Sequence, residues 1–253
     1  MRDANAPADP AVHPPHPVLP HYYDRADQRE GFVRDIFDRT AGDYERIERI
    51  VGLGMGSRYR REALLRAGLK SGMRVLDVAT GTGLVIREAL AILGDTPAIV
   101  GLDRSGEMMR SGLKPCAIPL VQGSAERLPF ADAQFDFISL GFALRHMADL
   151  RSVFGEFRRV LRPGGIVCLL EITPPDRPWQ RNLLKFYLKR VVPLLSRAMA
   201  RNAETPQLFR YFWDTIEACV PPAQVLEALE LEGLTAAHRH VEVRVFSEYT
   251  ARR

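Results

Sequence analysis

Short apolar segments alternate with helical stretches from Met73 to about residue 172. The apolar segments lie at about 75–79, 98–102, 118–121, 135–140 and 166–172. They lack the period-two alternation of strands with one wet face, so we expect each strand to be buried on both faces, as in a parallel sheet. Strands that alternate with helices in this way predict an open α/β sheet with helices on both sides.

The composition is typical of a folded globular chain. The 253 residues are 46% hydrophobic and 26% charged, which is too apolar for a disordered chain and too polar for a bundle of membrane helices. No apolar run approaches the roughly 18–20 residues of a spanning helix, and the first residues lack the pattern of a secretory signal. Cys116, Cys168 and Cys219 are odd in number, widely spaced and without a CxxC pair. We therefore expect a cytoplasmic protein without a disulfide framework or a zinc site.

The chain divides into an arm and one domain. Residues 1 to about 27 hold six of the 18 prolines and almost no apolar periodicity, which predicts a disordered arm over 1–27. Helical periodicity precedes the alternating region, interrupts it once, and returns before two final strand-like runs. The expected parts of the domain at 28–253 are N-terminal helices at 28–68, a core at 73–172, a helical insertion at 177–218, and a final helix and strands at 221–253.

The first strand of the core runs directly into a glycine-rich turn. Residues 75–83 read Val-Leu-Asp-Val-Ala-Thr-Gly-Thr-Gly, and a helix over 84–93 follows. Gly81 and Gly83 allow a ligand to lie against the backbone, and the N–H groups of the helix N-terminus then face it. Asp103 ends the next strand, where its carboxylate can accept both hydroxyl groups of a ribose. The pattern favours a nucleoside-bearing cofactor over a plain strand-to-helix turn.

The residues favour S-adenosylmethionine over a nicotinamide dinucleotide. The dinucleotide fingerprint needs a third glycine where this chain has Ile86, and no second mononucleotide-binding half is visible. The third strand is followed by loops at 122–126 and 128–130 that can hold an adenine through a polar side chain and a backbone N–H. A ligand with one ribose and no pyrophosphate fits this set better, and S-adenosylmethionine is such a ligand.

Two sets of motifs resemble known methyltransferases. The first set occurs in the order of class I S-adenosylmethionine-dependent methyltransferases: Asp77…Gly81-Thr-Gly83, Gly101-Leu-Asp103, Leu128-Pro-Phe130 with Phe135-Asp136, and Leu161-Arg-Pro-Gly-Gly165. A narrower set resembles the ubiquinone/menaquinone biosynthesis C-methyltransferase family over about 32–246, through residues 36–44, 53–59, 142–146, 170–172 and 186–193. The resemblance implies a Rossmann-like α/β fold. Its sheet is seven-stranded and mostly parallel, with helices on both faces, an antiparallel C-terminal strand, N-terminal helices and a helical lid insertion.

The resemblance also implies which residues hold S-adenosylmethionine. By position it makes Thr82 and Asp103 cofactor contacts, with Ser124 and Ala125 at the adenine. A serine of the family falls on Gly141, the family's Gly-Leu-Arg-Asn reads Ala-Leu-Arg-His at 143–146, and its C-terminal end is replaced by 245–251. Cofactor binding survives these departures, whereas the acceptor stays open. The expected cofactor-binding set is Asp77, Thr80, Gly81, Thr82, Gly83, Asp103, Arg104, Ser124, Ala125 and Gly141, with no metal site.

Methyl transfer to a ring carbon needs a base and a cation. A ring carbon becomes nucleophilic when a neighbouring hydroxyl loses its proton, and the phenolate must then be stabilised. Arg145 and His146 follow the fourth strand at the carboxyl edge of the sheet. We expect Arg145 to hold the oxyanion, His146, with an ordinary pKa of about 6.5, to take the proton, and Tyr44 to close the pocket from above. Each has a structural alternative: Arg145 pairs with a carboxylate such as Asp149, His146 is a strand-end residue, and Tyr44 belongs to the core.

The net charge of +4 comes from one basic segment. Between Asp176 and Glu204 there are seven basic residues and no acidic one, interspersed with aliphatic and aromatic residues. We expect this segment to act first as a lid over the pocket and then to contact an anionic membrane through 177–201. Nucleic-acid binding is not expected, because no recognition module is visible. The expected partners are a hydrophobic small-molecule acceptor, a membrane to which a cytoplasmic protein is peripheral, and a second copy of the chain in a homodimer.

Three functional hypotheses follow. The first is methyl transfer from S-adenosylmethionine to a ring carbon of a quinol-like or other hydrophobic molecule. The second is an O- or N-methyltransferase of secondary metabolism, which the changes at Gly141, His146 and the C-terminus keep open. The third is a scaffold that binds the cofactor without catalysis. Consumption of the cofactor separates the two enzymes from the scaffold.

Overall fold

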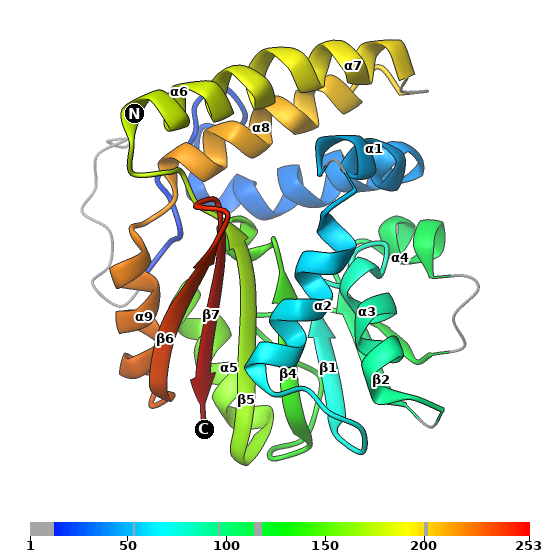
Figure 1. Cartoon of the computed structure of the whole chain (residues 1–253), viewed down its shortest axis with the longest axis vertical. Coiled ribbons are helices and arrows are strands. Elements are labelled where there is room, and N and C mark those ends of the chain that lie inside the picture. Colours follow the sequence, from blue (N-terminus) through cyan, green and yellow to red (C-terminus); the bar gives the residue numbers. More distant parts are fainter. Residues whose placement is uncertain (1–12, 53, 96, 114–117, 200–201) are drawn as a thin grey trace.

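The computed structural model describes residues 13–52, 54–95, 97–113, 118–199 and 202–253, and a seven-stranded sheet lies at its centre (Figure 1). The strand order is β3-β2-β1-β4-β5-β7-β6. The first five strands run parallel, and β7 is antiparallel to both β5 and β6. The fold class expected from the sequence is confirmed. The strands are β1 Arg74–Val78, β2 Ala98–Asp103, β3 Leu120–Gln122, β4 Phe135–Gly141, β5 Leu161–Ile172, β6 Thr235–Glu242 and β7 Phe246–Arg252.

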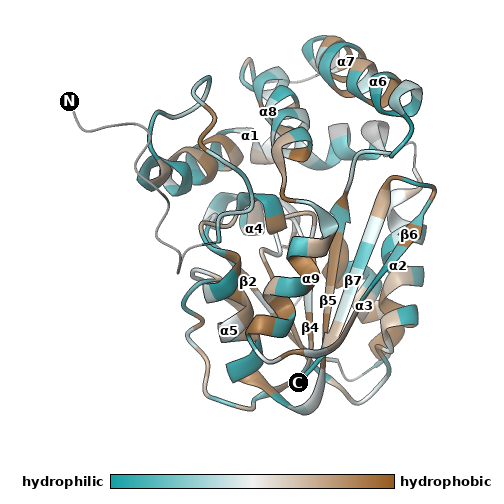
Figure 2. Ribbon diagram, turned by 90° about the vertical axis from the view of Figure 1, so that its left-hand side faces the viewer, coloured by the Kyte–Doolittle hydropathy of each residue, from teal (hydrophilic) through white to brown (hydrophobic). Residues whose placement is uncertain are grey.

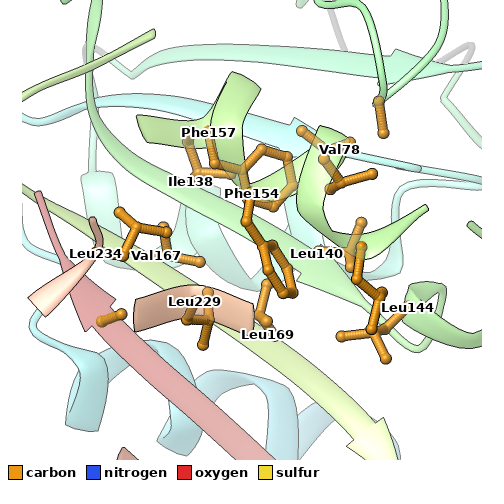
Figure 3. Close-up of a cluster of buried hydrophobic side chains, with 14 of the residues drawn as sticks. Val78, Ile138, Leu140, Leu144, Phe154, Phe157, Val167, Leu169, Leu229 and Leu234 are labelled. Carbon is orange, nitrogen blue, oxygen red and sulfur yellow. The ribbon is translucent and has the colours of Figure 1, made fainter. Parts of the chain in front are cut away.

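Helices cover both faces of the sheet and its carboxyl edge. On one face, α2 and α3 pack against Val75, Phe137 and Cys168 of the strands. On the opposite face, α5 and α9 pack against the strand residues that alternate with these three. Figure 3 shows Phe154 and Phe157 of α5 among Val78, Ile138, Leu140 and Val167. The flanking helices are α2 Gly56–Ala67, α3 Leu84–Leu93, α4 Gly106–Gly112, α5 Leu150–Val160 and α9 Pro222–Leu231. Because adjacent strand residues enter opposite clusters, the strands are buried on both faces as their sequence pattern predicted.

The remaining helices form a layer above the carboxyl edge of the parallel strands (Figure 1). Their bounds are η1 Ala26–Gln28, α1 Arg29–Val51, η2 Leu144–His146, α6 Pro178–Phe186, η3 Tyr187–Val191, α7 Val192–Met199 and α8 Thr205–Ala218. The π-helical turn η3 joins α6 to α7 as one outermost helical run. Leu188 and Val192 of this run pack on Phe209, Trp213 and Ile216 of α8. The insertion at 177–218 therefore has a small apolar core of its own, separate from the two clusters of the sheet.

The N-terminal segment, residues 13–28, packs against the body of the molecule. The carbonyl of His13 accepts from the Leu150 amide at 3.0 Å, and that of Pro15 accepts from the Val220 amide at 2.7 Å. His16 and Tyr23 are buried. The prediction of a disordered arm over 1–27 is thus wrong for 13–27, while residues 1–12 lie outside the described residues. Prolines lack an N–H but keep their carbonyls, so a proline-rich segment can still be held by donors from elsewhere in the fold.

Candidate active site

A cavity lies between α1 and the carboxyl ends of β1, β2 and β4. Its position matches the edge where open α/β sheets bind ligands. Helices α1 and α2 supply one wall, and the loops after β1, β2, β3 and β4 supply the other. The lining residues are Val33, Arg34, Phe37, Tyr44, Arg60, Ala79, Thr80, Gly81, Thr82, Leu84, Val85, Leu102, Asp103, Arg104, Ser105, Met108, Gly123, Ala125, Gly141, Phe142, Ala143, His146 and Met147.

Asp103 and the glycine-rich loop form one end of the cavity. One carboxylate oxygen of Asp103 accepts from the Gly81 amide at 2.6 Å, and the other accepts from the Ser105 amide at 2.8 Å. A side chain at Gly81 would meet only Met108, at 3.5 Å, whereas one at Gly83 would come within 2.0 Å of Leu113. Both glycines have positive φ. Gly81 therefore leaves space at the cavity, whereas the lack of a side chain at Gly83 makes room for Leu113 at the end of α4.

Asp77 lies beneath this loop and does not line the cavity. Its carboxylate accepts from the hydroxyl of Thr80 at 2.6 Å and from that of Ser139 at 2.6 Å. Burial raises its pKa to about 6, against the opposing effect of the two hydroxyl hydrogen bonds. Thr80 does line the cavity. Asp77, predicted as a cofactor contact, therefore lies behind Thr80 and is joined to it by a hydrogen bond.

Thr82 supplies an unused polar group at the same end. Its hydroxyl oxygen is buried and has no partner among the described residues. Native proteins rarely leave such a group unpaired, so the hydroxyl is well suited to bind a polar ligand. The position agrees with the cofactor contact that the sequence predicted for Thr82.

The loop after β3 meets the cavity through small residues. Gly123 and Ala125 line it, and Arg104 lines it from the end of β2. Ser124 does not: its hydroxyl contacts Arg104 at 2.6 Å and Glu126 at 2.6 Å. Of the predicted adenine contacts, the structure therefore brings Ala125 to the cavity, and Ser124 instead holds Arg104 in place.

His146 forms the opposite end, inside a cluster of aromatic rings. Its ring stacks on Tyr211, with centroids 5.5 Å apart, and meets Phe37 edge-on at 5.4 Å. Burial and then the positive charge of Arg145 hold the pKa of His146 well below its ordinary value, so the imidazole is neutral at physiological pH. Neither ring nitrogen has a partner among the described residues. A neutral histidine with unused nitrogens can accept a hydrogen bond from a hydroxyl in the cavity.

Tyr44 lines the cavity from α1. Its ring lies 6.0 Å from that of Phe37 and 6.5 Å from that of Phe212. Burial, with the nearby charge of Glu48, raises the pKa of Tyr44 to about 12. The phenol therefore keeps its proton at neutral pH and can act as a hydrogen-bond donor.

Arg145 does not line the cavity. Its guanidinium forms a buried ion pair with Glu171 on β5, donates to the Phe142 carbonyl at 2.8 Å and lies over the ring of Phe212 at 5.1 Å. The expected direct contact with an oxyanion is thus not made by this geometry. The structural alternative, in which Arg145 pairs with a carboxylate, is the one found, with Glu171 as the partner. Asp149 instead caps α5 through the amides of Arg151 and Ser152. Arg145 is a fixed cation behind His146.

Two features of the backbone at 141–142 explain why glycine stands at position 141, where the family has a serine. A side chain at this position would come within 2.5 Å of Val85, so a serine would not fit without a shift of α3. Phe142, which follows it, has φ of +59° and lines the cavity. Such conformations are costly for a residue other than glycine, and they gather at functional sites. Gly141 therefore lines the cavity without supplying a hydroxyl.

Sequence reasoning missed Arg60. Its guanidinium lines the cavity from α2, donates to Glu48 at 2.5 Å and lies over the ring of Phe142 at 5.2 Å. Its Nε is buried and has no partner among the described residues. Arg60 stands within a run of arginines whose other members look like a solvated helix face. The signal that could have found it is its helical spacing from Ala63, Leu64 and Ala67, which are all buried.

Within the described ranges, no three His, Cys, Asp or Glu side chains come together as a metal site. None of the helices there is long and apolar enough to cross a membrane.

Comparisons with known proteins agree with this geometry. The model of the ubiE/COQ5 methyltransferase family matches residues 24–242. Demethylmenaquinone methyltransferase of Roseiflexus sp. (strain RS-1) is 35% identical over 231 residues, which are 86% of this chain and 95% of that protein. Ubiquinone/menaquinone biosynthesis C-methyltransferase UbiE of Hahella chejuensis is 28% identical over 214 residues, 82% of this chain and 85% of that protein.

Solved structures share the fold. A SAM-dependent methyltransferase from Aquifex aeolicus superposes with a TM-score of 0.57 at 19% identity, over 82% of this chain and 96% of that one. A SAM-dependent methyltransferase from Thermotoga maritima gives a TM-score of 0.61 at 16% identity, over 87% and 98%. At this level of identity the likeness concerns the architecture alone.

Proposed function

Because this chain belongs to the ubiE/COQ5 methyltransferase family, we propose that it moves a methyl group from S-adenosylmethionine to a ring carbon of a quinol, of the demethylmenaquinol type. Methyl transfer from S-adenosylmethionine is the activity of the family. What we propose for this chain is the acceptor and the atom that is methylated. The observation that carries it is one cavity with two unlike ends. Asp103 and the glycine-rich loop lie at the first, and His146 among aromatic rings at the second.

We assign the donor to the first end. Asp103 would accept the ribose hydroxyls, Gly81 would leave room for the backbone to approach, and Thr82 would supply its unused hydroxyl. Ala125 and Gly123 would lie at the adenine. Arg60 is the buried cation best placed to bind the carboxylate of the methionine part, because its Nε is unused.

We assign the acceptor to the second end. A flat apolar ring fits between Phe37, Phe142 and Tyr44, which line the cavity together with Met147. His146 would accept a hydrogen bond from the ring hydroxyl and draw away its proton as the carbon attacks. The pKa of His146, which burial lowers, would rise when a phenolate forms beside it, since an opposite charge favours the imidazolium. Arg145 would stabilise the phenolate from behind His146 through its positive charge. Its ion pair with Glu171 holds that charge in a fixed position.

The proposal is tested by product analysis. The full chain is incubated with S-adenosylmethionine carrying a labelled methyl group and with chemically reduced demethylmenaquinone, and the product is fragmented in a mass spectrometer. The expected result is one labelled methyl group on a ring carbon. A label on oxygen or nitrogen would support the alternative enzyme class, and cofactor binding without any methylated product from a panel of quinols would support the scaffold.

We further propose that the run α6–η3–α7 contacts an anionic membrane, which makes the protein peripheral to the membrane on its cytoplasmic side. Helices α6 and α7 lie on the outside of the molecule (Figure 2). Trp179, Leu183, Phe186 and Leu194 of this run are 58–67% exposed. Among the described residues, Lys185 and Lys189 pair with Glu217 and Asp214 of α8. The exposed Arg177, Arg190 and Arg197 are then left to meet lipid phosphates, and exposed apolar residues beside cations are typical of helices that lie in a membrane interface.

Flotation with vesicles tests this contact. The chain should float with phosphatidylglycerol vesicles and not with pure phosphatidylcholine, and the double change Trp179→Ser and Phe186→Ser should abolish flotation. Leu231→Ser is the matched control, since Leu231 is 54% exposed on the separate helix α9. A chain that does not float but elutes as a dimer, which the same double change converts to a monomer, would show that a second copy covers this face.

A further inference from the structure

The turn that joins β6 to β7 holds two consecutive residues in a conformation that side chains disfavour. Val243 and Arg244 have φ of +51° and +61°. Turns of this kind are ordinarily built from asparagine, aspartate or glycine, and a β-branched valine in this region is an outlier. Val243 is nevertheless 65% exposed, so packing against the described residues does not account for its conformation. A valine at this place indicates a contact outside the chain.

The turn is tied to the start of α6. The Thr173 amide donates to the Val245 carbonyl at 2.8 Å, and the Thr173 hydroxyl lies 2.7 Å from that of Ser247. Helix α6 begins at Pro178, so the link from Thr173 spans at most about 18 Å. Two of the linking residues, 174 and 175, are prolines, which restrict the backbone. The turn lies below α6 in Figure 1 and in Figure 2, beside the run that we assign to the membrane.

The charges around the turn suit an anionic surface. Arg244 is exposed at its tip. Glu242, just before the turn, pairs with Arg66 at 3.0 Å. Asp176 of the link to α6 is exposed, and Arg177 follows it directly. An exposed valine beside an exposed arginine matches the interface of an anionic bilayer, where the apolar group meets acyl chains and the cation meets phosphates.

The same hairpin reaches the wall of the cavity. Phe246, at the start of β7, stacks on Tyr59 with centroids 4.6 Å apart and meets Phe142 edge-on at 6.3 Å. Phe142 lines the cavity. A turn that inserts into lipid would therefore bring this aromatic wall close to the bilayer, the phase in which an apolar acceptor dissolves.

We propose that the β6–β7 turn is a second lipid contact, in which Val243 inserts into the interface of an anionic membrane and Arg244 binds lipid phosphate. The inference rests on the membrane contact proposed above for the run α6–η3–α7 and adds a separate point to it. Two points of contact fix the tilt of the molecule on the surface, whereas one helix leaves it free to roll. Asparagine or glycine would relieve the strain at Val243, but only by removing the apolar group that meets the lipid.

Partitioning of the full chain into phosphatidylglycerol vesicles, measured by flotation, tests the turn. Val243→Asn should weaken partitioning about tenfold, because it removes an apolar side chain from the lipid. The same change should raise Tm by about 2–4 °C, because asparagine tolerates positive φ. Val243→Leu keeps an apolar group and should float as wild type does.

Arg244→Gln tests the charge at the turn. It should weaken partitioning about fivefold at low salt and by less at high salt, since the contact with phosphate is electrostatic. The loss in Val243→Asn should persist at high salt. The matched control is Ala236→Asn near the opposite end of β6: Ala236 is also exposed and has φ of +52°, so this change should raise Tm without altering flotation.

Each contrary outcome points to a different error. Flotation of Val243→Asn equal to that of wild type would overturn the inference and leave the contact of α6 standing. Failure of wild type to float would overturn it together with the proposed contact of α6. A lower Tm in Val243→Asn would overturn it by showing that Val243 packs within the fold. A dimer that Val243→Asn converts to a monomer would overturn it by assigning the turn to a second copy.

Discussion

The two ends of the cavity are built in different ways. The donor end comes from short stretches, 79–85 and 102–105, that follow neighbouring parallel strands, and its main contacts are backbone amides to Asp103. The acceptor end brings together Tyr44 of α1 and His146 of η2, with Tyr211 of α8 and His16 of the N-terminal segment behind them. The sheet ladder positions the first, and packing between distant segments positions the second. Variants should therefore separate cofactor affinity at one end from turnover at the other.

The largest expected effect is on stability, at the ion pair behind the acceptor end. Arg145→Met leaves the Glu171 carboxylate buried and unpaired, so the free energy of unfolding should fall by about 3–5 kcal/mol. Adding Glu171→Gln should restore most of that loss without restoring turnover. Urea unfolding followed by circular dichroism measures both.

Arg151→Met is the control for this prediction. Its ion pair with Glu232 is partly exposed, and the expected loss is at most about 1 kcal/mol. If Arg145→Met lowered the free energy of unfolding by no more than Arg151→Met does, the buried ion pair would not stabilise the acceptor end.

The second expected effect is on turnover. His146→Ala should lower kcat by about 10²-fold or more, within the range for loss of a general base, and leave the Kd of S-adenosylmethionine unchanged. His238→Ala, on the edge strand β6, should leave kcat unchanged. Steady-state kinetics at saturating cofactor measures kcat, and calorimetry measures Kd. Full turnover of His146→Ala from pH 6 to 9 would make His146 a structural residue.

The third expected effect is on cofactor affinity. Asp103→Ala removes a carboxylate at the donor end and should weaken S-adenosylmethionine binding by about 1.5–3 kcal/mol, with kcat near wild type at saturation. Asp132→Ala, at a carboxylate that is 75% exposed and far from the cavity, is the control. Calorimetric titration checks both. Unchanged affinity in Asp103→Ala would remove the donor from this end of the cavity.

The smallest expected effect is the pH dependence of stability at the acceptor end. The pKa of His16 is lowered to about 4 in the folded protein, so as pH falls below 6.5 the unfolded chain takes up a proton that the folded chain does not. Stability contributed by neutral His16 is therefore lost as pH falls from 6.5 toward 4. His146, whose pKa is also lowered, acts in the same direction, whereas Asp77, with its pKa raised to about 6, acts in the opposite one.

Urea unfolding of wild type and His16→Gln across this range measures the part due to His16. The stability of His16→Gln relative to wild type should rise as pH falls from 6.5 to 4. A constant difference between the two would show that His16 is not buried in its neutral form.

The sequence predicted the sheet and the donor end from local patterns. Apolar runs without alternation predicted strands buried on both faces, and Val75 and its neighbours do enter opposite clusters. Gly81 and Asp103 line one cavity because the turn after one strand and the end of the next meet at the same edge of any parallel sheet. Asp77 and Ser124, predicted as cofactor contacts, lie behind Thr80 and Arg104 and do not line the cavity. Spacing in the sequence does not tell a residue that lines a cavity from one that supports it.

The acceptor end was predicted less well, because its partners lie far apart along the chain. Nothing near Arg145 in the sequence indicates that Glu171 will neutralise it, and an arginine after a strand looks equally suited to an oxyanion. The proline-rich composition of the N-terminal segment predicted disorder, but His13 and Pro15 find donors on Leu150 and Val220. Arg60 was hidden among arginines that face solvent.

The amino-acid sequence alone determined the order of the elements, the two-faced burial of the sheet and the carboxylate and glycines of the donor end. Periodicity, glycine conformation and strand-end geometry all act within a few residues, so they can be read from neighbouring positions. Only the tertiary structure decided which cations are neutralised, which histidines are neutral and which segment lies behind the acceptor. Those properties depend on burial and on charges brought together by long-range packing, and both exist only once distant parts of the chain are in contact.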